Sequence, residues 1–371
     1  MDEWKEYVLE DLLSYEQPTP FIVESTDYDD KYKTPVLTAG KSFILGYTDE
    51  DFGIYTSLPV IIFDDFTTAT QYVNFPFKVK SSAMKILTAN TELVLPKFIF
   101  YRMQMIEFDH STHKRYWIQQ YSKIKVQIPP ISEQEHIVTR IEALFSQLDS
   151  GVETLKKVKQ QLTVYQQTVL KEAFEGIATY IPFGRIVDSR LGKMLDKEKN
   201  TGISRKYIRN INVRWFSFDL SDLLEMRIED EEVDKYSICY GDLVICEGGE
   251  PGRCAVWEKD HTVFYQKALH RVRFLDKSNP KFYMYYLWFS AQSGQLSKFF
   301  TGTGIKHLTG QSLAKVPVPT AERVRQDSIV SEIEGKLSVC ESIEQTVDTA
   351  LQQAEATRQS ILKQTFERTV V

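Results

Sequence analysis

The chain has 371 residues, of which 42% are hydrophobic and 26% are charged, as is ordinary for a globular protein of two or three domains. No apolar run approaches the ~20 residues of a membrane-spanning helix, and the acidic start lacks the pattern of a secretion signal, so we expect a cytoplasmic protein without membrane contact. Four cysteines at wide spacings disfavour both a disulfide framework and a zinc site, so we expect no bound metal.

The net charge of -6 is unevenly distributed. Residues 1–60 are strongly acidic. In contrast, residues 61–126 carry nine Lys/Arg against five Asp/Glu, and residues 177–316 carry 21 against 17. Two separate basic blocks are therefore compatible with local contact to nucleic acid, although the whole chain is acidic.

Residues 1–127 read as a first globular segment. Short apolar or alternating runs such as LPVIIFDDF and YVNFPFKVK predict strands, and LPKFIFYRMQM predicts a helix. TAGKS lacks the first glycine of a phosphate loop, which excludes an NTPase site. The acids after VIIF lack the further acids of a metal nuclease. We expect either a turn at the end of the strand or hydrogen bonds from Asp and Thr side chains to base edges and the DNA backbone. The candidate DNA contacts of this segment are Lys41, Asp65, Thr67, Thr68, Lys78 and Lys80.

The segment of residues 128–177 contains one long predicted helix. Pro129 and Pro130 precede it, and no proline interrupts it. Apolar residues recur in steps of four and three over more than four heptads, as in a coiled-coil seam. A helix of about 40 residues would be roughly 60 Å long. The predicted seam positions are Ile137, Ile141, Leu144, Leu148, Leu155 and Leu162.

Residues 178–316 predict a second globular segment. The strand-like runs GDLVICEGG, CAVWEK and ALHRVRFL and the helical NPKFYMYYLWFSAQ follow the order of the first segment with little shared sequence. GEPGRC and TGTGIKHLTG are glycine-rich loops that could approach phosphates, or could simply be turns. Likewise, the basic strand residues could form only a solvated face. The candidate DNA contacts are Lys206, Arg209, Arg214, Arg253, His270, Arg271, Lys306 and His307.

Residues 317–371 predict a second long helix that repeats the first. A shift of 192 residues aligns VLKEAFEG with ILKQTFER and Ile137-Val138 with Ile329-Val330. Such a large offset indicates two half-molecules rather than a solenoid. Its seam is predicted at Ile329, Ile333, Ile343, Val347 and Ile361.

The predicted fold is α+β. It has two mixed α/β domains separated by two long antiparallel coiled-coil helices, with a pseudo-two-fold internal repeat. The alternative is that each helix packs only on its own globular core. The sequence contains no Ser-His-Asp order, HExxH, GxGxxG loop or [DN]PP[YF] motif, so we expect no catalytic residues.

The stretch VQIPPISEQEHIVTRIEALFSQLD leads into the first long helix, and the endings VLKEAFEG and ILKQTFER close the two helices. By these stretches, the whole chain resembles the DNA-specificity subunits of type I restriction-modification systems. TPVLTAGKSFILGYT and YGDLVICEGGEPGRCAV are similar to parts of two target-recognition domains. One departure is VPVPTAERVRQDSIV, which has two extra residues relative to the first copy and lacks its Glu-Gln pair.

The resemblance implies that each recognition domain reads one half of a bipartite site in double-stranded DNA and that the coiled coil sets the spacer. It implies two methyltransferase subunits and restriction/translocase subunits as partners. S-adenosylmethionine, ATP and Mg would bind to those partners, and this chain would bind no cofactor. The alternatives are a specificity subunit of a methylation-only system, a non-DNA coiled-coil adaptor, and a fused nuclease or methyltransferase.

Overall fold

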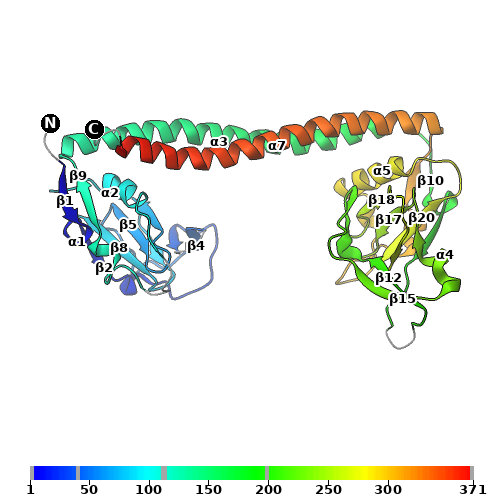
Figure 1. Cartoon of the computed structure of the whole chain (residues 1–371), viewed down its shortest axis with the longest axis horizontal. Coiled ribbons are helices and arrows are strands. Elements are labelled where there is room, and N and C mark those ends of the chain that lie inside the picture. The colour runs from blue at the N-terminus through cyan, green and yellow to red at the C-terminus, as the bar shows by residue number, and fades with distance from the viewer. Residues whose placement is uncertain (1–3, 39–41, 110–114, 197–199, 368–371) are drawn as a thin grey trace. The chain divides into compact units, whose positions relative to one another are not determined.

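The computed structural model describes residues 4–38, 42–109, 115–196 and 200–367. The chain divides into two compact units, Met1–Leu155 with Thr349–Val371 and Lys156–Asp348. Each unit contains one α/β domain and part of both long helices, α3 (Ile131–Phe174) and α7 (Arg323–Glu367) (Figure 1). The predicted fold class is therefore confirmed, and the four boundaries drawn from the sequence stay a prediction.

The first α/β domain consists of short strands and two helices. They are β1 (Lys5–Val8), α1 (Leu9–Leu12), β2 (Leu13–Glu16), β3 (Thr34–Leu37), β4 (Ile44–Thr48), β5 (Val60–Asp64), β6 (Thr70–Val73), β7 (Lys78–Val79), β8 (Met84–Ala89), α2 (Pro96–Met103) and β9 (Lys125–Ile128). An antiparallel sheet has the order β2-β8-β5-β6. A second sheet has the order β4-β3-β7, and β1 pairs with β9.

The second α/β domain has more elements. They are β10 (Tyr180–Pro182), β11 (Val187–Leu191), β12 (Ile203–Ile208), β13 (Val213–Arg214), β14 (Ser217–Phe218), β15 (Leu224–Ile228), α4 (Val233–Tyr236), β16 (Ser237–Ile238), β17 (Leu243–Cys246), β18 (Cys254–Val256), β19 (Val263–Tyr265), β20 (Leu269–Phe274), α5 (Pro280–Gln292), α6 (Gly310–Lys315) and β21 (Pro317–Pro319). Its sheets have the orders β11-β20-β17-β18 and β15-β12-β19-β16, with the pairs β10-β21 and β13-β14.

The two domains share one topology. β3 pairs antiparallel with β4 and parallel with β7, and β12 pairs in the same way with β15 and β19. In both domains a four-stranded antiparallel sheet precedes a helix that begins at a proline, Pro96 or Pro280. Proline suits the first helical turn because its missing N–H would have no partner there. The echo between the two globular segments is therefore a repeat of structure.

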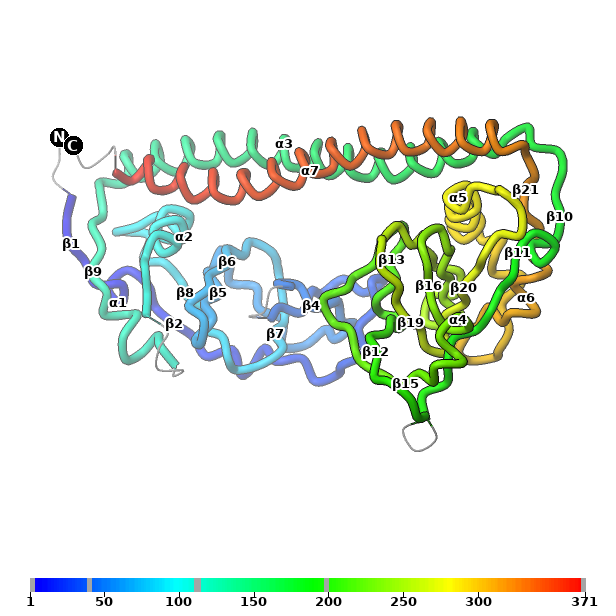
Figure 2. Tube along the Cα trace, turned by 45° about the vertical axis from the view of Figure 1, so that its right-hand side comes forward, coloured from blue at the N-terminus to red at the C-terminus, as the bar shows by residue number. Residues whose placement is uncertain are grey.

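The core of each domain includes side chains from both long helices. In the first unit, Ile137 and Ile141 at the start of α3 share a core with Leu362 near the end of α7. In the second unit, Leu170 near the end of α3 shares a core with Ile333 near the start of α7. Within each unit, the start of one helix thus lies beside the end of the other (Figure 2). Each buried aliphatic side chain of this kind contributes about 1.5–3 kcal/mol.

Ion pairs link the two helices within each unit. Asp149 pairs with Arg358 in the first unit, and the Arg358 guanidinium lies 4.3 Å from the centre of the Phe145 ring. In the second unit, Lys159 Nζ lies 2.7 Å from Asp348 Oδ1. These pairs are partly exposed, and exposed pairs contribute at most about 1 kcal/mol. The antiparallel arrangement therefore depends mainly on the apolar cores.

The buried faces of α3 and α7 follow the predicted steps of four and three with one correction of phase. Ile137, Ile141, Leu162, Ile329, Ile333 and Val347 are buried as predicted, and Leu144, Leu148, Leu155 and Ile361 are half-buried. Ile343 is 40% exposed, so the predicted seam is wrong at this position. Leu337 is 8% exposed and takes a core position that the sequence analysis did not choose.

The two helices bury equivalent positions. Positions 134, 141 and 145 of α3 are buried, and so are their counterparts in the second copy, positions 326, 333 and 337 of α7. The repeat thus extends from the sequence to the face that each helix buries. The phase differs from the prediction at Phe145 and Leu337, which belong to the cores of the domains. Phe145, for example, is buried one residue after the predicted seam position Leu144.

We expect Leu337→Ala to lower the free energy of unfolding by about 2–5 kcal/mol, because it removes buried methyl groups from the second core. Ile343→Ala should change it by less than about 1 kcal/mol, since a half-exposed side chain loses little on truncation. Urea unfolding followed by circular dichroism measures both values. Equal losses of unfolding free energy in the two variants would contradict this assignment and support Ile343 as a buried seam position, as predicted from the sequence.

Candidate functional site

A tight turn follows strand β5 in the first unit. Asp64 Oδ1 accepts hydrogen bonds from the backbone N–H groups of Phe66 at 2.8 Å and Thr67 at 3.3 Å. The backbone N–H of Thr68, which has a φ of 57°, donates to the Asp64 carbonyl. Asp commonly stabilises such turns through its side chain. The turn exposes Thr67 together with Phe66, which is 44% exposed.

Asp65 is 1% exposed and points inward, unlike its neighbours in the turn. Its Oδ1 accepts a hydrogen bond from the backbone N–H of Trp117 at 2.8 Å, and its Oδ2 lies 3.3 Å from Lys85 Nζ. The expectation of a surface carboxylate at Asp65 is therefore corrected. The carboxylate compensates a buried ammonium group, and removal of either partner would leave an unpaired charge in the core.

Lys78, which was predicted as a DNA contact, is completely buried. Its Nζ lies 2.7 Å from Glu50 Oε2, donates to the Phe52 carbonyl at 2.8 Å, and lies 4.2 Å from the centre of the Phe52 ring. Lys80 is half-buried, and its Nζ donates to the Tyr28 hydroxyl at 3.3 Å. Lys78 thus ties β7 to residues 50–52 in this fold, and only Lys80 has an accessible part.

The Glu50 carboxyl is stabilised in its charged form. Burial by itself raises its pKa, but hydrogen bonds from Lys78 and from the backbone N–H groups of Ser25 and Glu24, with the ammonium charge, outweigh burial and hold the pKa below its ordinary value. The Ser25 and Glu24 bonds measure 2.8 and 3.0 Å. Glu50 therefore stays ionised beside Lys78 at neutral pH.

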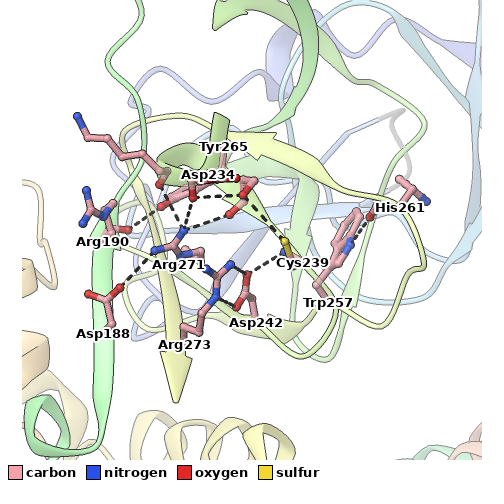
Figure 3. A network of polar contacts seen from close by, with 12 residues as sticks. Asp188, Arg190, Asp234, Cys239, Asp242, Trp257, His261, Tyr265, Arg271 and Arg273 are labelled. Atoms are coloured by element: carbon pink, nitrogen blue, oxygen red, sulfur yellow. Dashed lines mark hydrogen bonds and ion pairs between the residues drawn. The ribbon is translucent and has the colours of Figure 1, made fainter. Parts of the chain in front are cut away.

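Two of the basic residues predicted on β20 are also buried. His270 Nε2 donates to the Leu308 carbonyl at 2.9 Å, and burial, which outweighs that hydrogen bond, lowers the pKa of His270. Arg271 donates to the backbone carbonyls of Asp234, Lys235 and Ser237, each at 3.3 Å (Figure 3). The expectation of surface cations at His270 and Arg271 is corrected: one is a neutral connector, and the other holds the end of α4.

The neighbouring network in Figure 3 has the same structural character. Arg273 forms two hydrogen bonds of 2.7 Å to the buried carboxylate of Asp242, which also accepts from the Cys239 N–H at 2.8 Å. The Tyr265 hydroxyl donates to the Arg190 carbonyl at 3.2 Å. Bidentate pairs of this geometry hold both partners in one orientation. This network ties β20 to the turn before β17 and ties β19 to β11.

Three loops of the second unit meet at one surface, which we call the loop cluster: residues 209–215, 247–253 and 301–308. Asn210 Nδ2 donates to the Gly248 carbonyl, and Arg253 Nη2 donates to the Asn210 carbonyl at 2.9 Å. The Leu308 N–H donates to the Glu247 carbonyl at 2.7 Å. The structure thus brings together predicted residues from three separate stretches of sequence, namely Arg209, Arg214, Arg253, Lys306 and His307.

The arginines of the loop cluster have carboxylate neighbours. Arg209 pairs with Asp222, Arg253 Nη1 lies 2.9 Å from Glu250, and Arg214 lies 3.8 Å from Asp219. Lys306 is exposed, and its Nζ donates to the Gly302 carbonyl at 2.8 Å. Lys206 is exposed on β12. A surface with donors and acceptors side by side suits base edges, because guanine presents acceptors and cytosine a donor in the major groove.

Exposed apolar side chains were missed by the sequence analysis. Ile305 is 74% exposed and Ile211 is 50% exposed, both within the loop cluster. In the first unit, the Arg115 guanidinium lies 6.0 Å from the centre of the exposed Phe66 ring. Gly302 and Gly304 could have indicated the exposure of Ile305, because a large apolar residue in a glycine-rich loop has no core to enter. Apolar contacts with thymine methyl groups and base steps use such side chains.

Two predictions have a limited outcome. Lys41 lies outside the described residues. Among the residues that are described, no group of three His, Cys, Asp or Glu side chains could hold a metal ion. Within the same ranges, no helix combines the length and apolar character needed to cross a membrane.

Comparison with known proteins shows what this duplicated α/β architecture with two long helices is similar to. Residues 1–163 match the family model of the type I restriction modification DNA specificity domain. The EcoR124I/EcoR124II specificity subunit of Escherichia coli is 52% identical over 126 residues, which are 33% of this chain and 31% of that protein. The EcoKI specificity subunit of Escherichia coli K12 is 23% identical over 267 residues, 66% of this chain and 58% of that protein.

Residues 1–163 thus carry a type I restriction modification DNA specificity domain, and the predicted resemblance of the chain to specificity subunits of type I systems is confirmed. The matches span about a third to somewhat over half of the length of these two relatives. A chain from a study of type I system assembly and conformational transition has a TM-score of 0.74 at 14% identity, covering 99% of this chain and 98% of that one. The HsdS subunit of Thermoanaerobacter tengcongensis has a TM-score of 0.54 at 15% identity, covering 100% and 98%. These two likenesses show the shared fold.

We expect acid to remove the contribution of Glu50 to stability. Because the folded-state pKa is depressed, the contribution is fully present above the unfolded value of 4.5 and is lost as the pH falls through the folded pKa. Glu50→Gln should lose about 3–5 kcal/mol at pH 7, since Lys78 is left buried and unpaired, and should lose less on acidification than the wild type. Urea unfolding between pH 7 and pH 3 measures this. Parallel profiles for the two proteins would contradict the assignment.

Proposed function

We propose that the chain is the DNA-reading subunit of a type I restriction-modification complex. Each α/β domain reads one half of a bipartite site in double-stranded DNA. The observation that carries the proposal is the duplication itself: one topology occurs twice, each time completed by both long helices. The duplicated part supplies a framework, and the dissimilar loops on it supply two different specificities.

The loop cluster supports reading of one half-site in the second domain. Its arginines, carboxylates and exposed isoleucines offer direct contacts to base edges, while Lys206 and Lys306 suit phosphate contacts. The turn at residues 64–68, with Phe66, Thr67 and Thr68, is the corresponding candidate in the first domain. The similar proteins are named as specificity subunits of type I restriction enzymes, and this supports the same role here.

The long helices would set the spacer between the half-sites. α3 has 44 residues and α7 has 45, each about 65 Å long at 1.5 Å per residue. Their exposed faces would bind two methyltransferase subunits, and restriction/translocase subunits would join that core. S-adenosylmethionine, ATP and Mg would bind to those partners. This chain would direct their chemistry without being catalytic itself, and the complex would act in the cytoplasm.

Sequencing of modified bases in cells with and without the chain, each with its methyltransferase subunit, tests the proposal. We expect a split adenine-methylated motif that depends on the chain. The double variant Ile305→Ala, Lys306→Gln should weaken recognition of one half-site about 5- to 150-fold, since loss of the apolar base contact of Ile305 costs about 1–3 kcal/mol and a phosphate contact is lost with Lys306. The other half-site should stay unchanged. If methylation is independent of the chain, or the purified chain methylates or cleaves DNA alone, the proposal is wrong.

The spacer role has its own test. One heptad inserted into each long helix, after Leu155 and after Asp348, preserves the period of the buried faces. Such an insertion lengthens each helix by about 10 Å, which is roughly three base pairs of DNA. Base-modification sequencing should show both half-sites intact with a longer spacer. An unchanged spacer would exclude the helices as the determinant of its length, and the substitutions Thr154→Ser and Thr349→Ser beside the insertion points serve as the control.

A further inference from the structure

The helices α2 and α5 begin with the same three residues. Pro96-Lys97-Phe98 opens α2, and Pro280-Lys281-Phe282 opens α5. The spacing between the two triplets differs from the spacing of the repeat in the long helices. The triplet is therefore a repeated feature of the α/β domains, and the residues of the long helices that it contacts can be compared between the two units.

A buried glutamine contacts the start of each domain helix. Gln134 on α3 is 0% exposed, and its Oε1 accepts from the Leu95 N–H at 2.8 Å. Gln326, at the equivalent position of α7, is 2% exposed, and its Oε1 accepts from the Asn279 N–H at 2.7 Å. Leu95 and Asn279 are the residues just before α2 and α5. Thus Gln326 performs the same contact although the second copy lacks the Glu-Gln pair of the first.

The amide nitrogen of each glutamine side chain also forms hydrogen bonds. Gln134 Nε2 donates to the carbonyls of Pro129 at 2.8 Å and Leu93 at 3.0 Å. Gln326 Nε2 donates to the Ala321 carbonyl at 2.8 Å. Each amide therefore joins the beginning of a domain helix to the beginning of a long helix. Because such bonds are directional and their loss leaves buried groups unpaired, they specify one geometry.

A lysine–glutamate pair repeats in the same way. Lys97 pairs with Glu142 on α3 in the first unit. In the second unit, Lys281 Nζ lies 2.9 Å from Glu334, which occupies on α7 the position equivalent to Glu142. Lys281 also lies 3.1 Å from Glu258. These pairs are partly exposed, so their value lies more in orientation than in stability.

The third repeated contact involves the two helix endings that look alike in the sequence. Phe98 packs edge-to-face on Phe366 of α7, with ring centres 5.5 Å apart at 73°. Phe282 packs in the same manner on Phe174 of α3, at 5.4 Å and 64°. Phe174 and Phe366 are equivalent positions of the repeat and belong to AFEG and TFER. Each domain helix is thus held by the start of one long helix and the end of the other.

We propose that Gln134, the Lys97–Glu142 pair and the Phe98–Phe366 contact form a docking latch that fixes the orientation of the first domain on the long helices. Gln326, Lys281–Glu334 and Phe282–Phe174 form the second latch. The three contacts of a latch reach two different long helices, since the glutamine and the glutamate lie on one helix and the phenylalanine lies on the other. The start of the domain helix is therefore held by both long helices at once. An apolar core alone would permit small rotations, whereas a buried amide with fixed partners does not.

The latch residues are therefore positioning residues for DNA reading, and this consequence rests on the proposed function. They touch no DNA in this assignment. Instead, they keep each domain at a set angle to the helices that determine the spacer. Loss of a latch should loosen the spacer requirement and leave the half-site sequences unchanged.

The direct test measures orientation within the first unit of the full chain. Nitroxide labels at Ser57→Cys in the domain and Ser150→Cys on α3, both exposed positions, report their separation by double electron–electron resonance. Cys239→Ser removes the partly exposed native thiol, and the other three cysteines are buried. We expect Gln134→Leu to at least double the width of the distance distribution. The control Gln147→Leu, an exposed glutamine of the same helix, should leave it narrow.

Charge exchange keeps the test decisive if Gln134→Leu fails to fold. Lys97→Glu alone should broaden the distribution, and Lys97→Glu with Glu142→Lys should narrow it again, which a general loss of stability would not produce. Distributions of unchanged width in the folded variants overturn the latch. Base-modification sequencing of the same variants should show about the same half-sites with a spacer tolerance widened by one or more base pairs. A broadened distance distribution in a chain whose wild type directs no split motif supports the latch and refutes the proposed function.

Discussion

The structure depends on one packing constraint: neither α/β domain has a complete core without both long helices. In the first unit, the start of α3 and the end of α7 enter the core, and in the second unit the end of α3 and the start of α7 do so. Helices as long as α3 and α7 cannot bury their apolar faces alone, and a domain of short strands needs a cover for its sheet. The antiparallel order of the helices within each unit follows from this mutual requirement.

The same constraint explains why the helices are so alike and the domains so different. Residues that face the cores must match a repeated geometry, so Gln, Glu and Phe recur at equivalent positions of the two copies. Surface loops face no such requirement. The loop cluster of the second domain and the turn at 64–68 in the first can therefore differ completely while the topology beneath them stays the same. A framework that repeats under loops that vary is what the proposed reading of two different half-sites requires.

Part of the positive charge that suggested a nucleic-acid partner supports the fold itself. Lys78, Lys85 and Arg271 are buried and compensated by Glu50, Asp65 and a set of backbone carbonyls. Buried ion pairs are costly to break, and they fix register rather than add much stability. Several of the cations at the surface are paired with carboxylates, which favours contact with base edges over contact with phosphates alone.

The sequence by itself determined the internal repeat, the long helices, their steps of four and three and the α/β character of the domains, because these are expressed in local periodicity. It also contained the three stretches that meet in the loop cluster, without showing that they meet. Alternation placed Lys78 on a strand but could not tell its inner face from its outer one, since its partner Glu50 is distant in sequence. Only the tertiary structure decided that Leu337 and not Ile343 is buried, because an α-helix presents several possible stripes and the domain against it selects one.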